Sequence, residues 1–106
     1  MRPLKIKLLT HEIQWTRQAD KKFDKILAWL LVEWGERVTK SFVKKVYSII
    51  ETISEFPELG TLEHKEKGIR GFTIVKQINI FYKVSAGKII ILDFFDNRNS
   101  PAKKRF

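Results

Sequence analysis

Cysteine is absent from this sequence, and the only two histidines, His11 and His64, stand far apart. The lack of cysteine excludes disulfide bonds and thiol catalysis, and neither histidine has a partner at a metal-ligand spacing. The sequence also lacks a glycine-rich phosphate loop and a serine in a nucleophile-elbow context. We therefore expect no metal site, no cofactor and no covalent nucleophile.

Long apolar segments are absent too. No stretch approaches the roughly 20 apolar residues that a membrane-spanning helix requires. The first ten residues, MRPLKIKLLT, carry charge but no apolar run of signal-peptide length. Together with the lack of cysteine, these features predict a soluble protein of the reducing cytoplasm that has no membrane partner.

Basic side chains, by contrast, are abundant. The 21 lysines and arginines outnumber the 12 aspartates and glutamates, which gives a formal net charge of +9. A chain of 106 residues is expected to form a single domain, and its hydrophobic content of 43% suffices for one core. The excess positive charge attracts polyanions or acidic proteins. A basic protein without such a partner is the alternative interpretation.

The first half of the chain combines a strand pattern with two helical patterns. Leu4–Leu9 alternates apolar and basic residues as a strand does, and Ile13–Trp15 either belongs to that strand or forms its end. Two amphipathic patterns follow, and Gly35 between them suits a helix end, so the sequence predicts an antiparallel helix hairpin. The first apolar stripe consists of Phe23, Ile26, Leu27, Leu30, Leu31 and Trp34. The second, in a helix from about Glu36 to Glu55, consists of Val38, Phe42, Val46, Ile49, Ile50 and Ile53.

The second half is predicted to form strands. Pro57 cannot continue the helix, and the polar segment Thr61–Gly68 is expected to be a surface loop. Three strand-like runs then follow one another without a helix between them. They are Ile69–Val75, Ile80–Val84 and Lys88–Phe95, with turns at residues 76–79 and 85–87.

The predicted fold is therefore α+β. An N-terminal strand and an antiparallel helix hairpin precede a three-strand antiparallel meander, and the strands form one sheet packed on the helices. Residues 97–106 are expected to form a polar, basic tail of the single domain that comprises residues 1–106.

Positively charged side chains of the predicted sheet and its ends are the candidate functional residues. A guanidinium group binds phosphate through paired hydrogen bonds, and a cation stabilises the charge that develops when an RNA 2′-hydroxyl attacks its own phosphate. Aromatic rings can stack on bases, and Tyr82, Phe81 and Phe106 are candidates for this role. The candidate catalytic residues are Arg70 and Arg98, and the candidate nucleic-acid-binding residues are Lys76, Lys83, Lys103, Lys104 and Arg105.

Each candidate also has a purely structural interpretation. Arg70 and Lys83 can be solvated charges of the sheet, and Tyr82, which shares a strand face with apolar neighbours, is expected in the core. Arg98 can pair with an aspartate of the preceding strand. The three adjacent cations of the tail can belong to a solvated terminus.

Three segments together carry a family resemblance: FPELG at residues 56–60, GIRGFTIVKQINIFYKV at residues 68–84 and GKIIILDFFDNR at residues 87–98. In this order they resemble the RelE/ParE superfamily of type II toxin–antitoxin toxins, and the resemblance covers nearly the whole chain. It implies an α+β fold with a concave basic sheet, and a small antitoxin that wraps and neutralises the toxin. RelE-like members cleave mRNA on the ribosome, whereas ParE-like members poison DNA gyrase and are not nucleases.

The resemblance carries over to single residues unevenly. Arg70 and Arg98 fall where the nuclease branch has basic residues. Asn79 and Phe72 replace an arginine and a lysine of that branch, and Phe106 lacks the hydroxyl of its C-terminal tyrosine. The expected function is a growth-arresting toxin that inhibits translation by metal-independent, ribosome-dependent mRNA cleavage. A gyrase inhibitor without nuclease activity and a non-catalytic basic module that binds RNA or protein are the alternatives.

Overall fold

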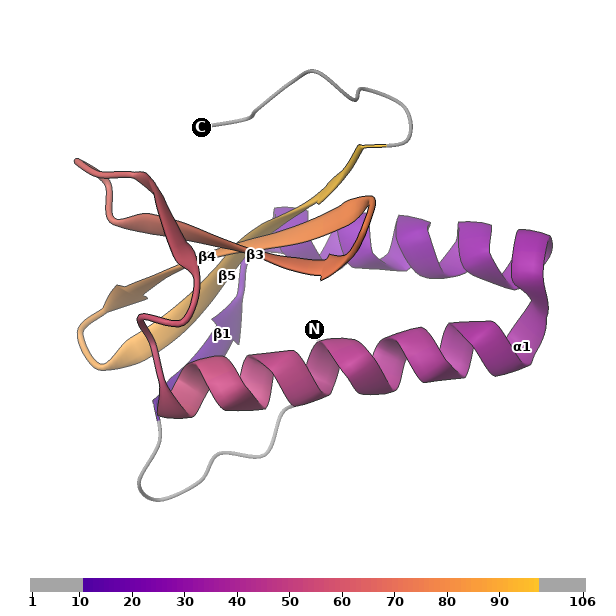
Figure 1. Cartoon of the computed structure of the whole chain (residues 1–106), viewed down its shortest axis with the longest axis horizontal. Helices are drawn as coiled ribbons and strands as arrows, with labels where there is room; N and C mark the ends of the chain where they lie inside the picture. Colours follow the sequence, from indigo (N-terminus) through magenta and orange to yellow (C-terminus); the bar gives the residue numbers. More distant parts are fainter. Residues whose placement is uncertain (1–10, 98–106) are drawn as a thin grey trace.

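The protein is an α+β structure in which one long helical element covers one face of a five-stranded sheet (Figure 1). This computed structural model describes residues 11–97. The strand order is β1-β5-β4-β3-β2, and β1 is parallel to β5 whereas the other neighbours are antiparallel. The elements are β1 (Glu12–Trp15), α1 (Arg17–Glu55), β2 (Thr61–His64), β3 (Ile69–Val75), β4 (Ile78–Ser85) and β5 (Lys88–Asp96).

The two predicted helices form the single element α1, which is broken at Gly35. Thr16 caps its start, because the Thr16 side chain accepts a hydrogen bond of 3.0 Å from the Ala19 N–H. The backbone of Gly35 is non-helical, with φ 89° and ψ 178°, a conformation that glycine adopts more readily than other residues. There α1 reverses its direction: the first arm, residues 17–34, runs from the sheet to the apex, and the second arm, residues 36–55, runs back (Figure 1).

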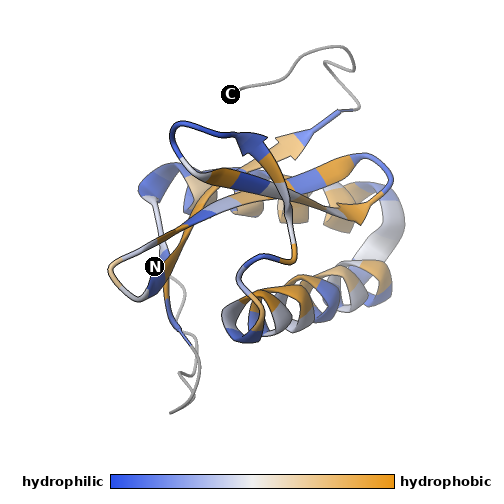
Figure 2. Cartoon of the chain, turned by 60° about the vertical axis from the view of Figure 1, so that its left-hand side comes forward, coloured by the Kyte–Doolittle hydropathy of each residue, from blue (hydrophilic) through white to orange (hydrophobic). Residues whose placement is uncertain are grey.

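The core lies between α1 and the sheet, and hydrophobic residues run along both (Figure 2). Its aromatic centre is a cluster in which the Phe23 ring centroid lies 5.1 Å from that of Phe94 and 5.3 Å from that of Trp15. The predicted apolar stripes are confirmed where α1 covers the sheet, at Phe23, Ile26, Leu30, Phe42, Val46, Ile50 and Ile53.

The stripes are wrong at the apex of α1. Leu31, Trp34 and Val38 are 52%, 63% and 40% exposed. The reason is geometric, because the apex extends past the strands (Figure 1), and no strand among residues 11–97 covers it there. Helical periodicity reports which residues share a helix face, but it does not report how far the opposing sheet reaches.

The predicted meander is the centre of a larger sheet. The segment expected as a surface loop, Thr61–Gly68, contains the strand β2, which pairs with β3 through Leu62 and Arg70. This pairing satisfies backbone groups that would otherwise be left at the edge of β3. The expected turn at residues 76–79 is shorter, since β4 already begins at Ile78. Of the N-terminal strand pattern, Ile13–Trp15 lies in β1, whereas Leu4–Leu9 lies outside the described residues.

A buried carboxylate connects the first turns of α1 to β5. The Asp93 side chain is 1% exposed, and its Oδ2 accepts a hydrogen bond of 2.8 Å from Gln18 Nε2. Its Oδ1 lies 3.3 Å from Lys22 Nζ and accepts a hydrogen bond of 2.8 Å from the Phe94 N–H.

Among residues 11–97, no helix combines the length and hydrophobicity needed to cross a membrane.

We expect Asp93→Ala to lower the free energy of unfolding by about 1–3 kcal/mol, because the Gln18 amide and the Phe94 N–H lose a buried acceptor. Urea unfolding followed by circular dichroism measures this change. The control is Glu36→Ala, which removes an exposed ion pair of 3.4 Å with Lys40 on the same helix and should leave the midpoint unchanged. Equal midpoints for Asp93→Ala and the parent would contradict an anchoring role for Asp93.

Candidate functional site

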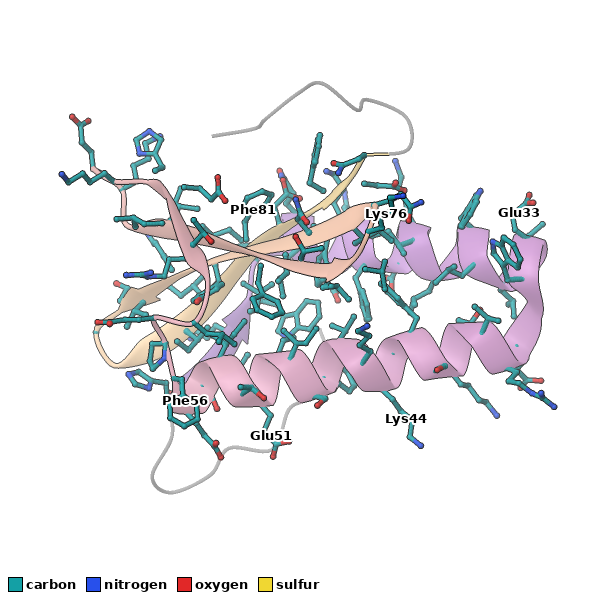
Figure 3. All side chains as sticks on the ribbon, in the orientation of Figure 1. Glu33, Lys44, Glu51, Phe56, Lys76 and Phe81 are labelled. Atoms are coloured by element: carbon teal, nitrogen blue, oxygen red, sulfur yellow. The ribbon has the colours of Figure 1, made fainter. Side chains whose placement is uncertain are left out.

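The candidate cations within the described residues do not gather on one surface. Arg70 lies at the start of β3 opposite Tyr82 of β4, and both side chains point to the α1 side of the sheet. Lys83 follows Tyr82 in β4 and therefore lies on the opposite face. Lys76 stands in the turn after β3 (Figure 3), about 20 Å along the strand from Arg70. Arg98, Lys103, Lys104 and Arg105 lie outside the described residues.

The aromatic candidates within the described residues are buried. Tyr82 belongs to the main core and is 0% exposed, so the structural interpretation of this residue is confirmed. Phe81, labelled in Figure 3, packs with Ile69 and Phe95 in a second apolar cluster and is 2% exposed. Neither ring offers an exposed face on which a base could stack. Phe106 lies outside the described residues.

The Tyr82 hydroxyl holds the loop between α1 and β2. It donates a hydrogen bond of 2.8 Å to the Pro57 carbonyl and accepts one of 2.8 Å from the Gly60 N–H. Gly60 is required here, because a Cβ at this position would lie 2.8 Å from the Gly71 carbonyl oxygen and 2.9 Å from the Tyr82 ring. The segment FPELG at residues 56–60 therefore matches Tyr82 in both shape and hydrogen bonding.

Arg70 holds the same loop from the neighbouring strand. Its Nη1 donates hydrogen bonds to the Gly60 carbonyl at 2.8 Å and to the Glu58 carbonyl at 3.4 Å. Arg70 is therefore neither a fully solvated strand residue nor a guanidinium free of protein contacts. Sequence reasoning missed this contact, although FPELG and Arg70 both stood among the motifs that carried the family resemblance.

A pocket of about 400 Å³ opens beside Arg70. It lies next to the loop that connects α1 to β2. Two of its apolar residues, Leu62 and Val84, are each 43% exposed. His11 also lines it, and the His11 Nδ1 lies 3.0 Å from the Ser54 carbonyl oxygen. Within residues 11–97, no three acidic or histidine side chains stand close enough together to hold a metal ion. The lining residues are His11, Pro57, Glu58, Leu62, Gly68, Arg70 and Val84.

Burial raises the pKa of the Tyr82 phenol above its ordinary value of 10.0. The hydrogen bond from the Gly60 N–H and the positive charge of Arg70 both act in the opposite direction, but burial outweighs them. The neutral phenol can donate to the Pro57 carbonyl, whereas a phenolate cannot.

Residues 13–101 match the family model described as the ParE toxin of the type II toxin-antitoxin system, parDE. Among solved structures, the chain resembles the chromosomal ParDE toxin–antitoxin system from P. aeruginosa, with a TM-score of 0.69 and 18% identity over 82% of this chain and 96% of that one. It also resembles the YoeB/ParE toxin from Agrobacterium tumefaciens, with a TM-score of 0.58 and 13% identity over 80% and 96% of the two chains. A chain of the E. coli DinJ-YafQ toxin-antitoxin complex gives a TM-score of 0.57 and 10% identity over 86% and 97%. No curated protein matches the chain. At these identities, the structural likenesses establish a shared fold.

We expect Tyr82→Phe to lower the free energy of unfolding by about 1–3 kcal/mol, because the Gly60 N–H and the Pro57 carbonyl both lose their partner. Urea unfolding of the purified variant measures the loss. Tyr47→Phe is the matched control, since the Tyr47 hydroxyl has no hydrogen-bond partner among residues 11–97. Similar losses for both variants would show that the Tyr82 hydroxyl does not stabilise the loop.

The raised pKa of Tyr82 also predicts a pH dependence of stability. Above pH 10.0, the unfolded phenol loses its proton while the folded one keeps it, so stability falls as the pH rises from there through the folded-state pKa. Below pH 10.0 the contribution is fully present. Unfolding midpoints of the parent and Tyr82→Phe across this range measure the effect, and the difference between them should shrink with rising pH. A constant difference would contradict a raised pKa.

Proposed function

Because residues 13–101 match its model, this chain belongs to the ParE toxin family of type II toxin–antitoxin systems, and we propose that it poisons DNA gyrase rather than cutting RNA. Gyrase is the target that the resemblance implies for ParE-like members. The observation that carries this choice is the position of Arg70. The one candidate catalytic arginine in the described part of the chain is bound to its own FPELG loop.

The arrangement of the other cations supports a binding mode of action. Cleavage of RNA by general acid–base chemistry requires several groups within hydrogen-bond reach of one phosphate. Lys76 lies about 20 Å from Arg70 along β3, and Lys83 lies on the other face of the sheet. A toxin that acts by contact with a protein needs a complementary surface, but it needs no such convergence.

Ribosome-dependent mRNA cleavage stays a prediction with one specific observation in its favour. The partners of Arg70 are backbone carbonyls, and within residues 11–97 no carboxylate pairs with its guanidinium. Its positive charge is therefore available to a phosphate. In this alternative, Arg70 and Arg98 would bind phosphate and stabilise the transition state.

We further propose a cognate antitoxin as the physiological partner, as expected for a toxin of this family. The net charge of +9 favours an acidic partner segment. A segment that orders on binding and presents an amphipathic helix could also cover exposed apolar residues of the toxin. We also propose that the toxin acts in the cytoplasm, where its proposed target and partner lie.

Brief induction of the chain in cells without the antitoxin tests the proposal. We expect growth arrest with double-strand DNA breaks and unchanged mRNA 5′ ends. Breaks are measured by gel electrophoresis of chromosomal DNA, and mRNA ends by 5′-end mapping. Purified chain added to gyrase and supercoiled plasmid should likewise give linear DNA.

Co-expression with the product of the adjacent small open reading frame is the control, and it should restore growth and suppress the breaks. New mRNA ends within translated codons, without breaks, would replace the gyrase proposal with mRNA cleavage. Normal growth despite soluble protein would refute the toxin assignment itself.

A further inference from the structure

We propose that the pocket beside Arg70 binds a carboxylate side chain of the antitoxin together with a neighbouring aliphatic side chain. We call it the Arg70 pocket, formed by His11, Pro57, Glu58, Leu62, Gly68, Arg70 and Val84. This inference rests on the proposed toxin function and specifies the surface on which the antitoxin acts.

The first argument is the unbalanced charge of Arg70. The side chain is half-buried, and its partners are the carbonyl oxygens of Glu58 and Gly60, which carry no formal charge. A partly buried cation gains most from an anion that also accepts its hydrogen bonds. Although Glu58 lines the pocket, its carboxylate forms no ion pair with Arg70. Within residues 11–97, the structure therefore gives Arg70 no anionic partner.

The second argument is the set of donors that remains on Arg70. Both hydrogen bonds to the loop come from Nη1. A guanidinium has five N–H donors in a planar fork, so Nη2 and Nε remain for an incoming group. A carboxylate has two oxygens and can accept two parallel hydrogen bonds from such a fork.

The third argument is the apolar wall, which favours a peptide over RNA. Leu62 and Val84 are each 43% exposed and line the pocket together with Pro57. An aliphatic side chain from a peptide would bury these surfaces, whereas the sugar–phosphate backbone of RNA would leave them against polar groups. The pocket therefore fits an acidic residue next to an aliphatic one in a protein segment.

Calorimetric titration with the purified product of the adjacent open reading frame tests the pocket. Val84→Glu should weaken binding by about tenfold or more, because it sets a negative charge against the incoming carboxylate. Thr73→Glu is the matched control, since Thr73 is an exposed, β-branched residue of the same sheet and lies on the face away from α1. It should change the affinity by less than about twofold. Equal weakening by both variants would attribute the loss to net charge and would overturn the pocket.

Substitutions of Arg70 itself show how much of the antitoxin affinity depends on its positive charge and how much on its planar guanidinium. Arg70→Gln should weaken binding by about 30-fold or more, and Arg70→Lys should recover only part of the loss, because a lysine lacks the planar fork. Circular dichroism verifies that each variant is folded. Parental affinity in folded Arg70→Gln would overturn the proposal, and Val84→Glu decides the question if Arg70→Gln does not fold.

Hydrogen exchange locates the contact without any substitution. Antitoxin binding should slow the exchange of amides in residues 58–62 and 82–85, whereas a short RNA oligonucleotide should not. Protection by the RNA in place of the antitoxin would assign the pocket to nucleic acid and overturn the inference.

The growth assay distinguishes a failure of the pocket proposal from a failure of the proposed function. Thr73→Glu should arrest growth as the parent does, so unchanged antitoxin binding by folded Val84→Glu refutes the pocket alone, and a non-toxic parent refutes the proposed function.

Discussion

The hydrogen bonds of one buried phenol hold together the region on which the candidate site depends. The Tyr82 hydroxyl joins the Pro57 carbonyl to the Gly60 N–H and thereby fixes the chain between the last turn of α1 and β2. Both backbone groups would otherwise need other partners at the edge of the core, and an unsatisfied buried group is costly. With the loop fixed, its carbonyls stand where Arg70 can reach them, and the pocket beside Arg70 acquires a defined wall.

A second buried polar group acts at the opposite end of the helical element. Asp93 receives hydrogen bonds from Gln18 of the first turns of α1 and from its own neighbour Phe94. α1 is therefore tied to the sheet close to its start through Asp93, and the chain just after its end is tied through Tyr82. Between these two anchors the packing is apolar, whereas the apex around Gly35 extends past the sheet and keeps large hydrophobic side chains exposed. The anchors fix the direction of α1, while the burial of apolar surface supplies most of the stabilisation.

Local patterns predicted the class of the fold and most of its elements, because they depend on near neighbours in sequence. The alternation in β4 placed Tyr82 and Lys83 on opposite faces, and the helical spacing identified the buried stripe of α1. What the sequence did not predict depends on distant partners. The strand β2 has a short and polar sequence, and it is a strand only because β3 offers it an edge. The loss of burial at Leu31 and Trp34 depends on where the sheet ends.

The candidate site illustrates the same limit in chemical terms. Arg70 was identified from its residue type and its place in a family motif, and neither indicates what its guanidinium binds. That depends on the FPELG loop, which lies at least ten residues away in sequence and approaches closely because Gly60 has no side chain. An arginine whose Nη1 already donates to two carbonyls is held in one orientation, so its remaining N–H groups present a fixed fork to a planar acceptor. The loop thus commits Nη1 to the protein itself, and only the rest of the guanidinium can recognise a partner.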